Sequence, residues 1–230
     1  MRIAVLIAAS VLVAGCSLGG DAERAEPSPS PPVRTTAATP GTTQESRPTS
    51  TPRAQPPGSG APVGEVIAFI ESGQRADPAT YHSATRDGTA TELGDDIAFT
   101  TPTGRANCMT DGKYFGGALA CLVDLTNPPP QPAEVYGQWK GDWVDFAGPS
   151  VEVGSAHGDP GRFTRGTGPE LPYGHALAFG DYRCRADETG LFCVNYAHRS
   201  AVRFSADGVE PYGCLQKVTP PAGIGEKFSC

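Results

Sequence analysis

The sequence predicts a mainly β protein, in which a signal peptide and a disordered stalk precede a small disulfide-stapled antiparallel β sandwich or barrel with one short N-terminal helix. Three observations lead to this prediction. Short runs rich in β-branched and aromatic residues alternate with Gly, Pro, Asn and Asp in the second part of the chain. Six of the seven cysteines lie among these runs. Only one stretch has the apolar spacing of a helix.

The N-terminus has the features of an export signal. Met1 and Arg2 give a positive start, and residues 3–13 form an apolar run that is too short to span a bilayer. The run ends in "VAGC" (13–16), which resembles the lipobox of bacterial lipoproteins. That resemblance implies that residues 1–15 are removed, that Cys16 carries lipid, and that several acyl chains hold the protein to the outer face of a membrane. An ordinary secretory signal with a chance cysteine is the alternative.

The predicted linker covers residues 16–62. Residues 17–62 contain ten Pro, seven Thr, six Ser and no aromatic residue, with four basic and four acidic side chains. Such a segment buries too little apolar surface to offset its ordering entropy, so we expect it to be disordered. It would serve as a tether, and its Thr-rich part (35–43) also has the composition of O-glycosylated stalks.

Residues 63–230 are expected to form one extracytoplasmic domain. They contain 13 Lys and Arg against 21 Asp and Glu. This acidic balance argues against nucleic acid as a partner and against direct adhesion to anionic lipid headgroups, because both need a basic surface.

The elements of this domain follow from local patterns. Val63, Val66, Ile67 and Ile70 have helical spacing, and Gly73 is placed to cap the end of that helix. Seven runs have the composition of antiparallel strands: 97–101, 118–125, 143–148, 150–153, 175–180, 191–197 and 201–205.

Two regions of the domain resemble each other. "IAFTTPTGRANC" (97–108) followed by "GALACLV" (117–123) is echoed by "LAFGDYRC" (177–184) followed by "GLFCV" (190–194). Each would form a hairpin with a cross-strand disulfide, Cys108 with Cys121 and Cys184 with Cys193. The echo is either a duplicated unit or a coincidence of hairpin-forming sequence.

The cysteine count is consistent with export. Once Cys16 is set aside, six cysteines remain, enough for three disulfides with fifteen connectivities. We favour pairing of neighbours, which joins Cys214 to Cys230 and would contribute about 3 kcal/mol on the chain-entropy model. No Cys-x₂-Cys pair exists and no His has finger-like spacing, so we expect no metal site.

Catalytic groupings are weak. Four histidines are scattered, His157 and Asp159 lie in a Gly-rich turn, and Asp95, Asp96, Asp142 and Asp145 are carboxylates of the type that glycosidases use. "EPYGCLQK" around Cys214 resembles the Gly-Cys nucleophile segment of L,D-transpeptidases. However, Tyr212 stands where that family has a histidine, and a thiolate without a base is poorly activated.

Four aromatic and imidazole side chains are candidate ligand contacts. Trp139 and Trp143 lie four residues apart beside charged groups, an arrangement that would stack on sugar rings if both were exposed. Tyr173 and His175 flank a Pro-Tyr-Gly turn and would line a pocket. The alternatives are strand-embedded core tryptophans and a plain turn.

Three segments, 97–108, "LPYGHALAFGDYRC" (171–184) and "GLFCVNYAHRSAVRFS" (190–205), resemble small actinobacterial, especially mycobacterial, secreted proteins and lipoproteins with a domain of uncharacterised function. The resemblance implies an outward-facing envelope protein of a Gram-positive lineage and local pairing of the first four domain cysteines. It brings no catalytic residues and no cofactor.

We therefore expect a cell-envelope lipoprotein whose domain is a non-catalytic binding module for cell-wall glycan or an envelope protein. One alternative is a carrier with an apolar cavity for envelope lipid. The other is an envelope hydrolase or transpeptidase.

Overall fold

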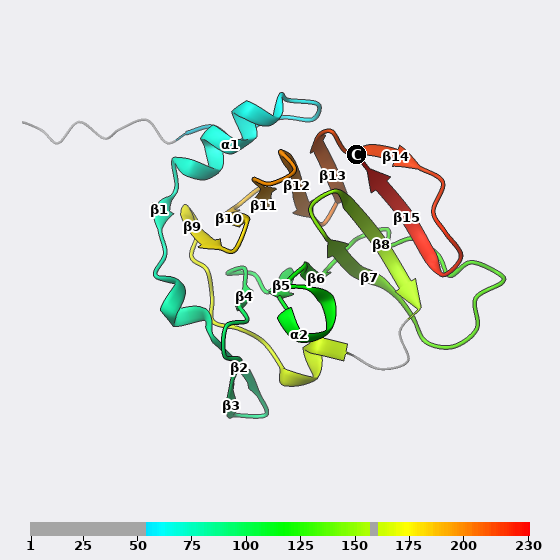
Figure 1. Ribbon diagram of the computed structural model, residues 1–230, viewed down its shortest axis with the longest axis horizontal. Helices are drawn as coiled ribbons and strands as arrows, with labels where there is room; N and C mark the ends of the chain where they lie inside the picture. Colours follow the sequence, from blue (N-terminus) through cyan, green and yellow to red (C-terminus); the bar gives the residue numbers. More distant parts are fainter. Residues whose placement is uncertain (1–53, 157–160) are drawn as a thin grey trace, which may run out of the picture. The chain divides into compact units, whose positions relative to one another are not determined.

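The computed structural model describes residues 54–156 and 161–230, which contain two large β sheets packed face to face (Figure 1). Residues 1–53, with Cys16, and the pair His157 and Asp159 lie outside the described part. The expectation of a mainly β, disulfide-bonded sandwich is confirmed.

One sheet is built on a five-stranded meander. Its strands are β4 (Ala98–Thr100), β5 (Ala106–Met109), β6 (Leu119–Val123), β7 (Trp139–Phe146) and β8 (Ser150–Ala156). The chain later returns to extend this sheet with β14 (Gln216–Val218) and β15 (Ile224–Ser229), giving the order β14-β15-β8-β7-β6-β5-β4.

The other sheet is built on a second five-stranded meander. Its strands are β9 (His175–Phe179), β10 (Tyr182–Asp187), β11 (Gly190–Asn195), β12 (Ser200–Ser205) and β13 (Gly208–Gly213). The two-residue strand β1 (Gln74–Arg75) runs parallel to β9 at one edge. All seven predicted strands are therefore present, in β4, β6, β7, β8, β9, β11 and β12.

The core lies between the two meanders, and each presents a row of side chains in register. In the first meander the row is Phe99, Cys108, Cys121, Val144, Val153. In the second meander the row is Leu177, Cys184, Cys193, Val202, Pro211. The four cysteines in these rows are fully buried, and all belong to one hydrophobic cluster. Both sheets therefore contribute to a single core.

Three disulfides join the neighbouring cysteines, as predicted. Cys108–Cys121 and Cys184–Cys193 link directly opposed residues with Cα atoms 4.0 and 4.1 Å apart, close to the separation of non-hydrogen-bonded pairs. Cys214–Cys230 instead joins the end of β13 to the residue after β15, and both of its cysteines are exposed.

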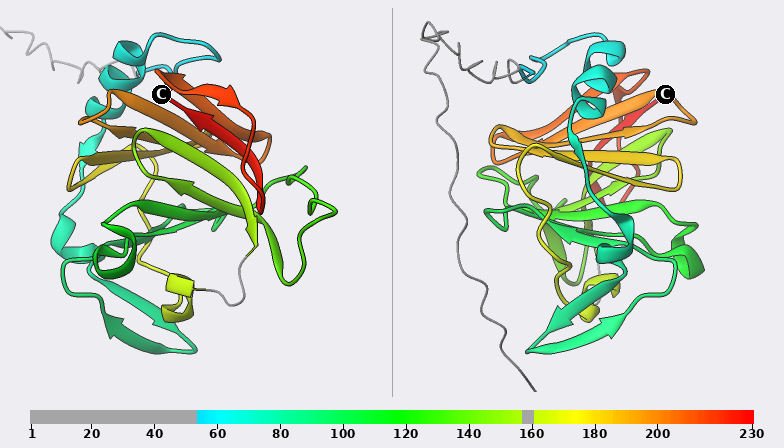
Figure 2. Two further views of the ribbon diagram at one scale, coloured as in Figure 1. Left: turned by 45° about the vertical axis from the view of Figure 1, so that its right-hand side comes forward. Right: turned by 90° about the vertical axis from the view of Figure 1, so that its left-hand side faces the viewer.

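The outer face of the second sheet is covered by helix α1 (Val63–Glu71), which appears above the yellow and orange strands in Figure 2. Val66 and Ile70 are buried against that sheet, as their helical spacing predicts, and Phe69, which that spacing did not include, is buried with them. The helix ends at Glu71, and its C-cap residue is Ser72, not the expected Gly73. Gly73 is needed for close approach, since a Cβ there would lie 2.9 Å from Ala176 Cβ.

The outer face of the first sheet is covered by a hairpin, β2 (Ser83–Arg86) and β3 (Thr89–Glu92), and by the 3₁₀ turn η2 (Gly161–Arg165). A second 3₁₀ turn, η1 (Pro78–Tyr81), precedes the hairpin, and a four-residue helix, α2 (Gly112–Phe115), connects β5 and β6. Helix α2 is a second helix that the sequence analysis did not predict. Its N-cap residue, Asp111, accepts a hydrogen bond from Tyr114 N at 2.9 Å.

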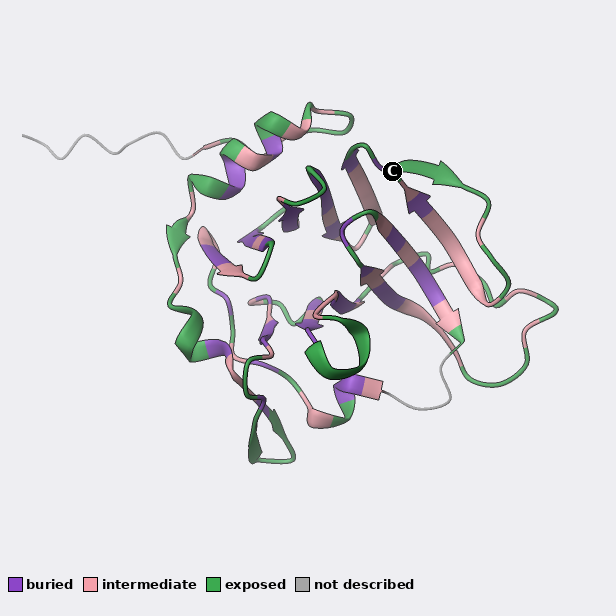
Figure 3. Ribbon diagram, viewed as in Figure 1, coloured by how far each residue is buried: buried purple, intermediate pink, exposed green. Residues whose placement is uncertain are grey.

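The described residues include some that composition assigns to the linker. Ala54 and Ala61 pack beside Val63 against the cluster under α1. Figure 3 shows buried residues along the strands and on one face of α1, whereas the β2–β3 hairpin is largely exposed. Within the described residues, no helix is long and apolar enough to span a bilayer.

Candidate functional site

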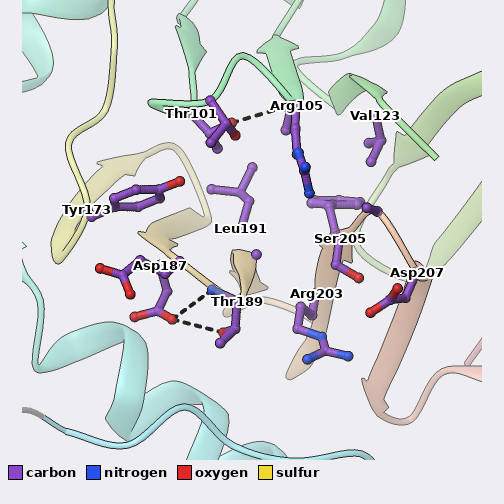
Figure 4. A pocket seen from close by; sticks show the side chains of 16 residues that line it. Thr101, Arg105, Val123, Tyr173, Asp187, Thr189, Leu191, Arg203, Ser205 and Asp207 are labelled. Atoms are coloured by element: carbon purple, nitrogen blue, oxygen red, sulfur yellow. Dashed lines mark hydrogen bonds between the residues drawn. The ribbon is translucent and has the colours of Figure 1, made fainter. Parts of the chain in front are cut away.

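A cavity of about 390 Å³ lies at one end of the sandwich, where loops from both meanders meet (Figure 4). Its lining comes from the β4–β5 loop, the β10–β11 turn, the β12–β13 turn, the end of β6 and the segment before β9. Its volume falls at the small end of the range of ligand pockets, so the cavity suits a small molecule.

The β4–β5 loop presents Arg105 to this cavity. Gly104 N donates to Thr101 O at 2.8 Å, and Pro102 precedes the tip, which is the arrangement of a tight β-turn. Ala106 N then donates to Thr101 Oγ1 at 3.1 Å, and Thr101 N donates to Ala106 O at 3.0 Å. These bonds close the loop and leave Arg105 exposed at its end.

The β10–β11 turn contributes carboxylates on the opposite side. Asp187 is 5% exposed, and its Oδ1 accepts hydrogen bonds from Thr189 N at 3.1 Å and Thr189 Oγ1 at 2.9 Å. Gly190 closes the turn at φ 142°, and a Cβ there would lie 2.5 Å from Phe204 O. Glu188, at the tip, is exposed, so this turn brings two carboxylates to the cavity.

The β12–β13 turn supplies a third carboxylate, Asp207, which is exposed. Arg203 also lines the cavity, but its Nη2 lies 2.9 Å from Glu210 Oε2 on the neighbouring strand. In Figure 4 the Arg203 guanidinium points away from Leu191 at the centre. The positive charge of Arg203 is therefore already balanced by Glu210.

The lining between these turns is apolar. Ala106, Val123, Leu191 and Phe204 are buried core residues that reach the cavity at the ends of their strands. The ring of Tyr173 lies beside Leu191 in Figure 4, and it packs against the same core cluster. A ligand there would contact an apolar floor and polar groups above it.

Charged residues of opposite sign lie on different sides of the cavity. The first meander contributes Arg105, whereas the second contributes Asp187, Glu188 and Asp207. In Figure 4, Arg105 and Asp187 lie on different sides of Leu191. Within the described residues, Arg105 has no ion pair through its side chain. The lining therefore has a cationic group on the side of the first meander and carboxylates on the side of the second.

Of the four predicted ligand contacts, Tyr173 alone lines the cavity. His175 pairs with Gln74 in the second sheet, and its Nδ1 lies 3.4 Å from Tyr173 O. Trp139 is half-buried, and its Nε1 donates to Pro129 O at 2.9 Å.

Trp143 requires a correction. It is 2% exposed, it packs edge-on against Phe163 with ring centroids 4.9 Å apart, and its Nε1 donates to Asp145 Oδ2 at 2.8 Å. Its ring therefore belongs to the core under η2 and presents no face to a ligand. Trp143 is therefore the strand-embedded core tryptophan of the alternative interpretation, and the two tryptophans do not form an exposed pair.

Three of the residues considered for catalysis, Asp96, Asp145 and Cys214, are engaged in holding the fold. Asp96 Oδ1 accepts hydrogen bonds from Gly112 N at 2.7 Å and Thr110 Oγ1 at 3.0 Å, and Asp145 lies 3.7 Å from the buried Arg162. Burial lowers the pKa of Arg162, while Asp145 acts in the opposite direction. Cys214 is bonded to Cys230, so its sulfur is not a free thiol in this structure.

Sequence reasoning missed Arg105, Asp187, Glu188 and Asp207. The turn sequences "DETG" (187–190) and "SADG" (205–208) were available as hairpin signals, but nothing in them indicates that the two turns share a cavity with Arg105. Within residues 54–156 and 161–230, no group of three or more His, Cys, Asp or Glu is arranged to hold a metal ion.

Comparison of the chain with family models, with curated proteins and with solved structures found no match.

Proposed function

We propose that this protein is a cell-envelope lipoprotein, held to the outer face of the plasma membrane by lipid on Cys16, whose domain is a non-catalytic binding module. The end cavity takes the ligand. The observation that carries this proposal is the meeting of loops from both meanders around a cavity with an apolar floor and charged sides. Binding residues concentrate on loops that a rigid scaffold positions, which is the arrangement seen here.

A binding role is favoured over catalysis because the cavity lacks the expected reactive groups. Its lining includes no cysteine and no histidine, and Asp187 is held in a turn by Thr189. Asp95, Asp96, Asp142 and Asp145, the carboxylates considered for glycoside hydrolysis, all lie outside the lining. Asp96 bonds to Gly112, and Asp145 pairs with Arg162.

A lipid carrier receives less support. That function needs inward-facing residues that enclose a long apolar void, whereas here they pack with one another into one cluster. Phe99, Phe146, Leu177 and Leu191 are each at most 1% exposed within it. The end cavity also has charged sides, which do not suit a hydrocarbon chain.

The proposed location rests on the sequence. The positive start, the short apolar run and the small residues before Cys16 support lipidation, and the three disulfides agree with an oxidising compartment outside the cytoplasm. The resemblance of residues 97–205 to actinobacterial secreted proteins supports a Gram-positive envelope. The linker would hold the binding domain away from the membrane.

The anchor is tested with the full chain expressed in an actinobacterial host. Cys16→Ala is expected to move the protein from the membrane fraction to the culture medium and to abolish labelling by a palmitate analogue. Ser17→Ala, the neighbouring control, is expected to leave both unchanged. Membrane retention and labelling of the Cys16→Ala protein would contradict the anchor.

The binding role is tested with the exported chain, residues 16–230, carrying Cys16→Ser. A set of small polar probes is titrated into the ¹⁵N-labelled protein, and amide shifts are followed by NMR. Probes are expected to shift amides of the cavity loops, such as Arg105, Thr189 and Ala206. A set that leaves all the cavity amides unmoved would contradict the proposed binding role.

A further inference from the structure

We propose that the exposed bridge between Cys214 and Cys230 is a thiol-exchange site, at which a dithiol protein with a Cys-x-x-Cys segment reduces the bridge through a mixed disulfide on Cys214. The site is separate from the end cavity, because Cys214 follows β13 at the end of that strand opposite to the β12–β13 turn. It therefore adds to the proposed binding role and does not depend on it.

The position of this bridge distinguishes it from the other two. Each buried bridge joins neighbouring strands of one sheet. Cys214 instead follows β13 of the second sheet, and Cys230 follows β15 of the first sheet. Both residues are exposed, and thiol–disulfide exchange needs access to a sulfur atom. A thiolate in solution thus reaches this bridge and not the two in the core.

A cleft of about 610 Å³ lies beside Cys214. It is lined by residues 60–63, by His198 and Arg199 in the β11–β12 turn, and by residues 211–216 around the cysteine. Cys230 is not part of the lining. A thiolate that enters the cleft meets Cys214 first, so the incoming sulfur bonds to Cys214 and Cys230 is released.

The charges of the cleft suit an anionic nucleophile. The lining includes Arg199 and His198 but no Asp or Glu, although residues 63–230 contain 21 acidic and 13 basic side chains. Arg199 is exposed and makes no ion pair within the described residues. The attacking group in exchange is a thiolate, which a nearby cation favours over the thiol. The cleft is therefore less repulsive to a thiolate than the acidic surface around it.

The backbone fixes Arg199 beside the cysteine. Ser200 pairs with Gly213, so Arg199 and Cys214 are neighbours where β12 begins and β13 ends. Arg199 has φ 50°, which is uncommon for a residue other than glycine, and a Cβ at Gly213 would lie 2.4 Å from Arg199 O. Cys214 Sγ lies 3.6 Å from His198 O, which accepts the S–H group once the bridge is reduced.

The reaction balances as two exchanges. A thiolate of the partner attacks Cys214 Sγ, the S–S bond breaks, and Cys230 leaves as a thiolate that takes a proton from water. The partner's second thiolate then attacks the partner sulfur of the mixed disulfide, and Cys214 leaves and is protonated. The bridge gains two electrons and two protons, and the partner is oxidised to its own disulfide. A single thiol would stop at the mixed disulfide, whereas a Cys-x-x-Cys partner completes the reduction.

Opening the bridge leaves both cysteines in place. Strand β15 stays paired with β8, Phe228 is buried, and Lys227 Nζ lies 2.6 Å from Glu152 Oε1. These contacts do not involve the bridge, and they keep Cys230 near Cys214, whose Cα atom is 4.7 Å away. We therefore expect the reduced protein to remain folded and the exchange to be reversible.

The test uses the exported chain with Cys16→Ser and a thioredoxin whose second active-site cysteine is replaced by serine, which traps the mixed disulfide. Trypsin places Cys214 in the peptide 204–217 and Cys230 in the peptide 228–230, so mass spectrometry identifies the sulfur that carries the adduct. The adduct is expected on Cys214. An adduct on Cys230 or on a buried cysteine, or the absence of any adduct, would overturn the proposal.

Reduction by intact thioredoxin and by glutathione, at equal thiol concentrations, separates a dithiol protein from a small thiol. Thioredoxin is expected to reduce the bridge about tenfold faster or more, because its second thiol resolves the mixed disulfide. Equal rates would overturn the assignment to a dithiol protein. Circular dichroism of the reduced chain should match that of the oxidised chain, and a loss of the β signal would contradict a reversible site.

Arg199→Asn tests the charge of the cleft. Asparagine tolerates the left-handed conformation, so this variant removes the charge without new backbone strain. It is expected to slow reduction by thioredoxin about threefold at low ionic strength, and less at high salt. Arg75→Asn, at an exposed arginine that does not line the cleft, is the matched control and should keep the wild-type rate. An Arg199→Asn protein with the wild-type rate would overturn the role of the cleft.

Discussion

The two meanders each have five antiparallel strands but differ in the loops that connect them. In each, the second and third strands carry a disulfide that faces the common core. The second meander joins β10 to β11 and β12 to β13 by two-residue turns, whereas the first inserts α2 between β5 and β6 and fifteen residues between β6 and β7. The number of strands and the position of the disulfide are thus the same in both meanders, whereas the connections between strands differ.

The structure also shows how far the sequence similarity between residues 97–123 and 177–194 extends. The echo aligned Phe99 with Phe179, but in the structure Phe99 lies opposite Cys108 and Leu177 lies opposite Cys184. The two segments are therefore equivalent with a shift of two residues, which keeps the same side chains facing the core. The two segments share the alternation of inward and outward side chains and the position of the disulfide. The residues that match in the sequence motif, such as Phe99 and Phe179, are not structurally equivalent.

The largest expected effects come from the outer faces of the two sheets. Phe192 packs edge-on against Phe69 of α1, and Trp143 packs in the same way against Phe163 of η2, both at 4.9 Å. Phe192→Ala and Trp143→Ala should each lower the free energy of unfolding by about 3–5 kcal/mol, measured by urea denaturation. Tyr136→Ala, at a ring that is 91% exposed, is the control and should change it little. A loss below about 1 kcal/mol at either buried position would contradict the equivalence of the two outer layers.

Removal of each buried disulfide sharpens the comparison further. The two bridges have similar sequence separations, 13 and 9 residues, so the chain-entropy model assigns each about 3 kcal/mol. Urea denaturation of Cys108→Ala/Cys121→Ala and Cys184→Ala/Cys193→Ala proteins should give similar losses. If only one pair destabilises the protein, the two bridges do not have the same role.

The third disulfide should differ from these two in its reactivity. Cys214 and Cys230 are exposed, whereas the other four domain cysteines are fully buried, and thiol–disulfide exchange depends on access to sulfur. Graded reduction followed by alkylation and peptide mapping should label Cys214 and Cys230 first. Labelling of a buried pair at the same reductant concentration would contradict this order.

The smallest effect concerns the polar margin between α1 and the second meander. Tyr196 donates to Glu71 Oε1 at 2.9 Å, and burial, followed by this hydrogen bond, raises the pKa of Tyr196 to about 12. The neutral phenol therefore stabilises the fold below pH 10, and this contribution is lost as the pH rises toward 12. Tyr196→Phe should make the free energy of unfolding fall less steeply over that range.

Denaturation at a series of pH values between 9 and 12 measures this slope. Tyr136→Phe, which changes an exposed ring, is the control and should keep the wild-type slope. A Tyr196→Phe protein with the wild-type slope would show that the contact with Glu71 does not couple folding to the phenol proton.

The sequence identified the strands whose composition is typical of a half-buried surface and missed those that tertiary pairing forms. Strand β10 contains two arginines, and Arg185 is buried because its guanidinium lies over the Phe69 ring and donates to Ser72 Oγ at 2.6 Å. Strand β13 contains Pro211, which a strand tolerates because β13 is at the edge of its sheet. Local composition predicts neither strand.

The candidate site was predictable only in part. Tyr173 was identified because it lies in a turn before a predicted strand, and it does line the cavity. Arg105 and Asp207 are about a hundred residues apart, in different meanders, and each alone has the appearance of an ordinary turn residue. Their shared cavity depends on how the two sheets pack, and this packing is not encoded in any local pattern.

The most direct test of the site is hydrogen–deuterium exchange of the exported chain with Cys16→Ser, with and without a probe that shifts the cavity amides in the NMR titration. A cavity formed by both meanders predicts slower exchange on binding in the β4–β5 loop and in both hairpin turns, 187–190 and 205–208. Protection confined to one meander, or located away from these loops, would contradict a ligand site formed where the two meanders meet.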